Sequence, residues 1–175
     1  GLNVYDATQL GQVISDGNIY TFQAAIDVQA TVPSYGLGPW YHTTVIAQTQ
    51  TIGSELSYPN ITVNGVHALS TVEISRVPFP VPFADNTFIV GHSTVWRLNG
   101  NDLNYTFDFP ASASSSSFDR LAIDTFTVLT GDVNADLVVD IQDITKIANN
   151  WLQAAATADA NGDGIVDIQD STLVA

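Results

Sequence analysis

The chain has 175 residues, a formal net charge of −14 at pH 7 and a mean hydropathy of +0.15. Its apolar fraction of 45% and aromatic fraction of 10% exclude a disordered acidic chain, which would be poor in both. Four basic residues are too few for a phosphate-binding surface, which excludes nucleic acid as a partner. The absence of cysteine excludes disulfides and thiolate chemistry. All apolar runs are shorter than the roughly 18 residues of a membrane span.

Residues 1–130 carry the patterns of a β-rich domain. Apolar and polar side chains alternate along 20–30 and along 103–109, the periodicity of strands with one buried face. Many short strands separated by Gly, Asn and Pro turns predict an antiparallel β-sandwich of the jelly-roll or Ig-like kind. The other strand-like runs lie at 41–52, 60–66, 70–77, 86–98 and 120–129.

Two segments interrupt this pattern. Three prolines between Val77 and Phe83 predict an extended loop or a crossover, because proline lacks the N–H that a central strand needs. The small polar run at 111–117 predicts a loop or a hairpin tip.

Residues 131–175 form an acidic tail, which we predict to be a separate module. This segment holds eight aspartates and one lysine, half of the net negative charge of the chain. It is also an internal repeat, since 131–148 and 158–175 are identical at ten of eighteen positions. Aspartates at this density repel one another unless a cation neutralises them.

Each copy of the repeat matches a twelve-residue calcium loop of the EF-hand type. Calcium prefers six to eight oxygen ligands, supplied by side chains at loop positions 1, 3, 5, 9 and 12 and by the backbone carbonyl of position 7. All the aspartates of the tail fall on these positions, so we predict two bound calcium ions. The predicted ligands are Asp132, Asn134, Asp136, Val138, Asp140 and Asp143 in loop one, and Asp159, Asn161, Asp163, Ile165, Asp167 and Asp170 in loop two.

Three loop positions qualify the match. Position 6 is a sharp turn that favours glycine, and Gly164 fits it whereas Leu137 does not. We therefore expect loop one to be strained or to turn differently, with weaker calcium binding. Position 8 is Val139 in one copy and Val166 in the other, apolar as expected where two loops pair back to back. Position 12 is Asp in both copies in place of the longer Glu.

The tail resembles a dockerin, a module with two calcium loops of the form D-x-N-x-D-x-x-x-D-x-x-D, each leading into a helix. The resemblance implies an extracellular bacterial module that folds on calcium and docks onto a partner domain called cohesin. Dockerins often have a Ser-Thr type pair at positions 10 and 11, where this chain has Ile141-Gln142 and Ile168-Gln169. The second helix is also short, because the sequence stops five residues after Asp170.

No catalytic set is evident, so we predict a non-enzymatic protein. The motifs of hydrolase nucleophiles, phosphate loops and zinc proteases are absent from the sequence. Its three histidines (His42, His67 and His92) have no short spacing that would mark a metal site. Trp40, in a turn region, is a candidate for stacking on a sugar. Asn60 and Asn104 begin two possible glycosylation sequons.

Two functions are consistent with these features. The first is a secreted, processed structural subunit, stabilised by calcium, that assembles with copies of itself into a filament or surface layer. In that case the apolar stretch from Leu2 to Val13 is a candidate strand for the open sheet edge of a neighbour. The alternative is a carbohydrate-binding or cell-surface module anchored by a dockerin–cohesin type interaction, with a polysaccharide as ligand.

Overall fold

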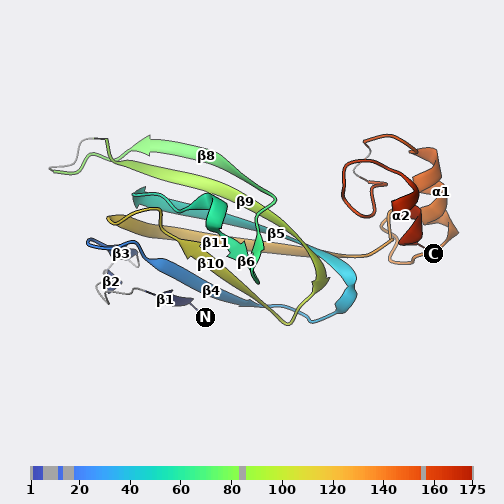
Figure 1. Cartoon of the computed structure of the whole chain (residues 1–175), viewed down its shortest axis with the longest axis horizontal. Helices are drawn as coiled ribbons and strands as arrows, with labels where there is room; N and C mark the ends of the chain where they lie inside the picture. The colour runs from blue at the N-terminus through green and yellow to red at the C-terminus, as the bar shows by residue number, and fades with distance from the viewer. Residues whose placement is uncertain (1, 6–11, 14–17, 83–85, 155–156, 175) are drawn as a thin grey trace. The chain divides into compact units, whose positions relative to one another are not determined.

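The computed structural model describes residues 2–5, 12–13, 18–82, 86–154 and 157–174 (Figure 1). These residues form a mainly β protein with two sheets and few helices. Among them, no helix combines the length and the apolar character needed to cross a membrane.

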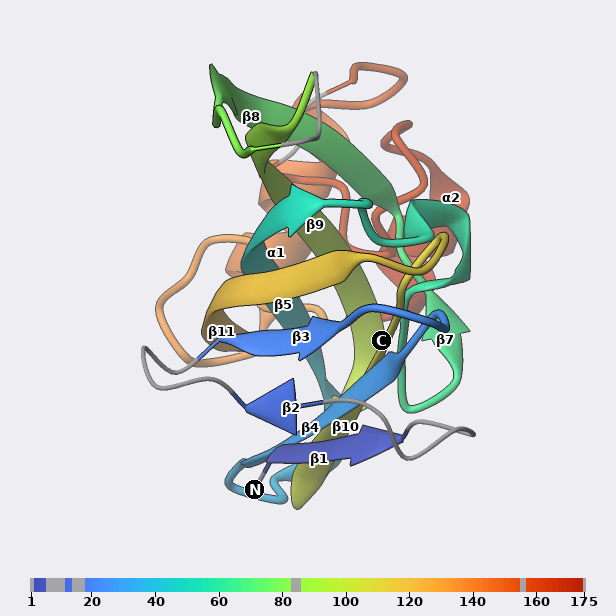
Figure 2. The same cartoon turned by 90° about the vertical axis from the view of Figure 1, so that its left-hand side faces the viewer.

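The strands form two antiparallel sheets, as Figure 2 shows for the neighbouring strands β1, β4 and β10. The first sheet has the order β1 (Leu2–Tyr5), β4 (Asp27–Pro33), β10 (Asn104–Pro110), β6 (Thr62–Val63), β7 (Val66–His67). The second has the order β2 (Gln12–Val13), β3 (Ile19–Thr21), β11 (Ser116–Leu129), β5 (Gly38–Gly53), β9 (Phe88–Asn101), β8 (Ser70–Pro78).

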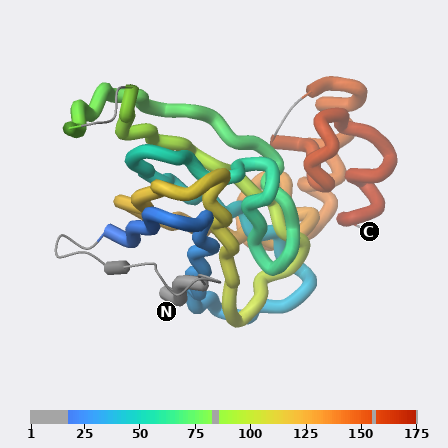
Figure 3. The backbone as a smooth tube through the Cα atoms, turned by 60° about the vertical axis from the view of Figure 1, so that its left-hand side comes forward, coloured from blue at the N-terminus to red at the C-terminus, as the bar shows by residue number. Residues whose placement is uncertain are grey.

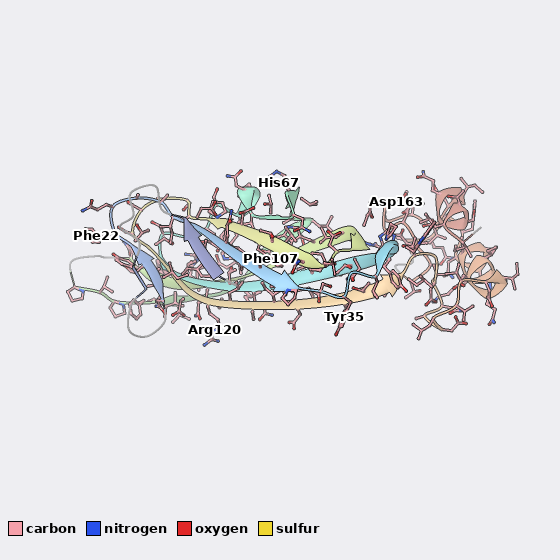
Figure 4. All side chains as sticks on the ribbon, turned by 90° about the horizontal axis from the view of Figure 1, so that it is seen from below. Phe22, Tyr35, His67, Phe107, Arg120 and Asp163 are labelled. Carbon is pink, nitrogen blue, oxygen red and sulfur yellow. The ribbon has the colours of Figure 1, made fainter. Side chains whose placement is uncertain are left out.

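One apolar core lies between the two sheets. Trp96 of β9 is fully buried and meets Phe107 of β10 edge to face, with ring centroids 5.9 Å apart. Phe109 of β10 packs on Phe118 of β11 in a tilted arrangement across the sheets, with ring centroids 5.6 Å apart. Figure 4 shows Phe107 inside the strand layers, while Arg120 points outward. Aromatic pairs that join two sheets confirm the predicted sandwich.

The predicted strand at 20–30 is wrong as a single element. The chain instead forms β3 and β4, which belong to different sheets, and Phe22 between them is 70% exposed. Leu103 is also exposed, at 69%, and lies outside the core. Alternation defines which face of a strand is buried, but it does not say where a chain leaves one sheet for the other.

The two interrupting segments are partly as predicted. β8 ends at Pro78, at the edge of its sheet, where proline is tolerated. Residues 79–82 follow without belonging to a named strand, and the rest of the predicted loop, 83–85, lies outside the described residues. The serine-rich segment ends earlier than expected, because Ser116 and Ser117 are buried residues of β11.

The N-terminal strands pair within their own chain. Leu2–Tyr5 aligns antiparallel with residues 27–30 of β4, and β2 aligns with β3. The described ends of the stretch from Leu2 to Val13 therefore pair with strands of the same chain, and its residues 6–11 lie outside the described residues.

The chain divides into two compact units that are not continuous in sequence. The larger unit holds Gly1–Gly36, Thr44–Leu98 and Asp102–Thr125, and the smaller one holds Leu37–Thr43, Asn99–Asn101 and Phe126–Ala175. In the smaller unit Asn101 donates to the hydroxyls of Thr43 (3.2 Å) and Thr127 (3.1 Å), which ties three strand ends together. Thr130 donates its N–H to the carbonyl of Trp40 at 2.9 Å. Hydrogen bonding therefore continues almost to the first residue of loop one.

The helices are α1 (Ile141–Asn149) and α2 (Ile168–Thr172), each following one acidic loop. Both begin with the same capping box, in which an aspartate at the N-cap and an aspartate three residues later exchange hydrogen bonds with the backbone. A small core of Ile147, Ala158 and Val166, with Val133 and Val174 at its margin, joins the two halves of the repeat.

Candidate calcium sites

The two acidic loops are built by the same hydrogen bonds. Eight bonds of 2.7–3.1 Å link identical loop positions in both copies. The carboxylate at position 1 accepts from the backbone N–H groups of positions 5 and 6, and the carboxylate at position 5 accepts from that of position 7. In these eight bonds the side chains therefore organise the backbone of both loops in the same way.

Position 12 closes each loop from the following helix. Asp143 accepts from the N–H groups of Val133 (2.9 Å) and Asn134 (3.0 Å) with one oxygen, and from that of Asp140 (2.8 Å) with the other. Asp170 accepts from positions 3 and 9 of its own loop in the same way. Both aspartates are fully buried. The first turn of each helix is thereby fixed against the start of its loop.

The turn at position 6 has the left-handed conformation in both loops. Gly164 has φ +96° and Leu137 has φ 71°, so loop one turns in the same direction as loop two. Leu137 is 82% exposed and gains no packing in return. A side chain in this region of backbone space is strained by about 1–2 kcal/mol. Of the two outcomes expected for Leu137, the structure therefore has the strained turn.

The predicted pairing of Val139 with Val166 is not observed. Val166 instead donates its N–H to the carbonyl of Gln153 (3.1 Å) and accepts from the N–H of Leu152 (2.8 Å). Position 8 of loop two is thus paired with the segment after α1. The apolar side chain of Val166 is nevertheless fully buried, as its position in the repeat predicts.

The charge of the module favours a cation. Within the described residues, the ion pairs involve only Glu55, Glu73, Arg76 and His92, and none reaches a loop aspartate. Lys146, the one basic residue of the tail, contacts the carbonyl oxygen of Val133. Buried carboxylates such as Asp143 and Asp170 need a compensating charge or strong hydrogen bonds.

The donor chemistry of both loops fits calcium, because each offers carboxylate, amide and peptide oxygens at alternate positions. Ligand oxygens around calcium lie within about 5 Å of one another, twice the metal–oxygen distance. Among the described residues, His, Asp or Glu side chains come this close together in one group of three. That group is Glu55, Glu73 and His92, which lie outside the loops. Calcium binding therefore requires the loop carboxylates to approach one another more closely.

The other predicted site residues are dispersed. Trp40 is 75% exposed, as a sugar-stacking residue must be. Asn60 and Asn104 are exposed at the start of their sequons. His67 is exposed and bonded to the carbonyl of Pro59 (3.1 Å), and His42 is half-buried in β5. The structure brings none of these residues together into a common site among the parts that it describes.

The sequence did not predict that one group of polar residues lies close together. Glu55, Glu73 and His92 come from the segment after β5, from β8 and from β9, and their ligand atoms lie within 4.8 Å of one another. Their separations in the sequence carry no signal. The register of β8 against β9 assembles them, since Glu73 stands directly opposite His92.

Comparisons with known proteins leave the family open. No family model matches the chain, and no curated protein or solved structure resembles it significantly.

Proposed function

We propose that the chain is a non-catalytic, extracellular structural protein whose dockerin-like C-terminal module binds two calcium ions. The repeated network of eight hydrogen bonds in the two loops carries this proposal. Each ion is held by the side chains at positions 1, 3, 5, 9 and 12 and by the carbonyl of Val138 or Ile165. The ion supplies positive charge to a module that has almost none of its own.

Calcium is expected to stabilise the module by linkage. An ion that binds only the folded loops contributes RT ln(1 + [L]/Kd), about 2.7 kcal/mol at a hundredfold excess over Kd. The core between the two halves is small, since it encloses three side chains among the described residues, those of Ile147, Ala158 and Val166. Without the ion, repulsion among eight aspartates opposes this small core.

We further propose that copies of the chain assemble through the free edge of β8. This nine-residue strand ends the order of its sheet, with β9 as its neighbour (Figure 3 traces the pair in green). It carries exposed apolar side chains at Val72 (59%), Ile74 (55%) and Val77 (54%). A long apolar edge strand is a template for pairing with another chain. Contacts of this kind that do not close on themselves produce a filament.

Light scattering of the purified protein in millimolar calcium, repeated after chelation, tests both self-assembly and its dependence on calcium. We expect large species that shrink on chelation. Ile74→Lys should leave the protein monomeric in calcium, because a charge on the edge blocks strand pairing. Val66→Lys, on the short edge strand β7 of the other sheet, is the matched control and should still assemble. A monomer in calcium and in chelator alike would refute assembly.

The alternative function is a carbohydrate-binding module anchored by its dockerin-like tail. The exposure of Trp40 supports this alternative. So does the exposure of Ile141 (68%) and Ile168 (63%), which occupy in the two loops the position that touches cohesin in dockerins. Binding to a polysaccharide that is lost in Trp40→Ala would favour it over self-assembly. Trp151→Ala, which also removes a partly exposed tryptophan, is the control for nonspecific loss.

A further inference from the structure

We propose that Glu55, Glu73 and His92 form a zinc site in which the guanidinium of Arg76 and the metal ion are alternative occupants. This site belongs to the sandwich, uses no residue of the calcium loops and does not depend on the function proposed above. The chain offers one imidazole and two carboxylates there, a donor set that zinc accepts.

The strands hold the three ligands against one another. Glu73 and His92 face each other across β8 and β9, and the ladder shifts register between Glu73 and Ser75. That irregularity lets Arg76 return to the side on which Glu73 lies, where it donates to Glu73 at 2.6 Å and to Glu55 at 2.8 Å. Each residue of the group is therefore fixed by backbone pairing or by a charge-assisted hydrogen bond.

His92 is the observation that points to a ligand. Its side chain is 91% buried, since only 9% is exposed, and its Nδ1 atom has no hydrogen-bond partner. Its Nε2 atom faces Glu55 Oε2 at 3.9 Å, which is too long for a hydrogen bond. The ring of Tyr58 lies over the imidazole at 3.9 Å between centroids and restricts its rotation.

Arg76 donates its hydrogen bonds to Glu55 and Glu73 and not to this imidazole. Its positive charge also opposes protonation of His92. Burial lowers the pKa of His92, and the neighbouring carboxylates only partly offset that effect. The neutral imidazole is the form that binds a metal. A divalent ion would bind His92 and both carboxylates at once.

Zinc binding requires two movements. Arg76, which has 38% of its side chain exposed, must swing away from the carboxylates. In the present arrangement its guanidinium carbon also lies 5.5 Å from the centre of the Phe88 ring. The ligand atoms, now within 4.8 Å, must then close to about 3.4 Å, as set by tetrahedral bonds of about 2.1 Å. Three protein ligands leave one position for water.

Calorimetric titration of the full chain with zinc chloride, in calcium that saturates the acidic loops, tests the site. We expect one zinc ion per chain. His92→Gln and Glu73→Gln should each weaken binding at least tenfold. Arg76→Gln should tighten binding at least tenfold, because it removes the competing cation. His67→Gln, at an exposed histidine on β7, should bind zinc like the unmodified chain.

A variant that fails to fold is recognised by far-ultraviolet circular dichroism. The nitrogen NMR signals of the histidine rings then give a second test in the unmodified protein, since zinc should shift only the signals of His92. If Arg76→Gln gains no zinc affinity, or if zinc leaves the signals of His92 in place, the group is an ion-pair network and the proposal is wrong.

Discussion

Gly131 lies against the backbone of Leu173, so close that a Cβ on this glycine would stand 2.5 Å from the Leu173 carbonyl oxygen. Gly131 also has φ +88°, a conformation that side chains rarely adopt. It directly precedes the first residue of loop one, whereas Leu173 caps α2 at the far end of the repeat. The end of α2 can therefore pack against the start of the repeat only because residue 131 has no side chain.

Gly131→Ala should therefore destabilise the module by about 1–3 kcal/mol, from backbone strain and the displaced end of α2. Chemical unfolding in saturating calcium measures the loss. Gly164→Ala is the matched control: its φ is +96°, but a Cβ there meets nothing within 4 Å, so that only strain remains. Equal losses in the two variants would show that the Leu173 contact has no energetic weight.

Leu137→Gly should stabilise loop one and tighten its calcium binding. The substitution relieves about 1 kcal/mol of strain at φ 71° and removes an exposed side chain, which corresponds to roughly fivefold in affinity. Calcium titration of the variant measures the change. Val138→Gly, at the next exposed position, relieves no left-handed strain and should not improve binding. If both glycines act alike, the strain assigned to Leu137 is not the cause.

Asp27→Asn should stabilise the sandwich at neutral pH. Burial first, and then the charge of Asp108, raise the pKa of Asp27 above 3.8, and its Oδ1 atom is buried without a hydrogen-bond partner. Between pH 3.8 and the raised pKa, the folded chain retains a proton that the unfolded chain has lost. Folding stability therefore falls as the pH rises through this window.

Thermal unfolding of Asp27→Asn and of the unmodified chain from pH 3 to pH 8 tests this penalty. The two midpoints should coincide at the acidic end and separate as the pH rises. Asp124→Asn, at an exposed position of β11, removes the same charge without burial and is the control for the loss of charge alone. A constant difference between Asp27→Asn and the unmodified chain at every pH would assign the effect to packing.

The repeated hydrogen bonds of the two acidic loops were predictable from the sequence, because the residues that make them stand at the same spacing in two short segments. The group of Glu55, Glu73 and His92 was not predictable, because strand register and a local irregularity bring it together. Likewise, the alternation at 20–30 identified buried residues such as Ile26 and Val28 but concealed the crossing between sheets. Sequence patterns therefore predicted local geometry better than contacts between strands.

The number of calcium ions bound per chain tests the central claim most directly, and equilibrium dialysis with metal analysis measures it. We expect two ions for the unmodified chain, one for Asp136→Ala and one for Asp163→Ala, since each substitution removes a ligand of a single loop. Asp124→Ala, outside the loops, should retain two. A chain that binds no calcium, or variants that still bind two ions, would contradict the assignment of both loops as calcium sites.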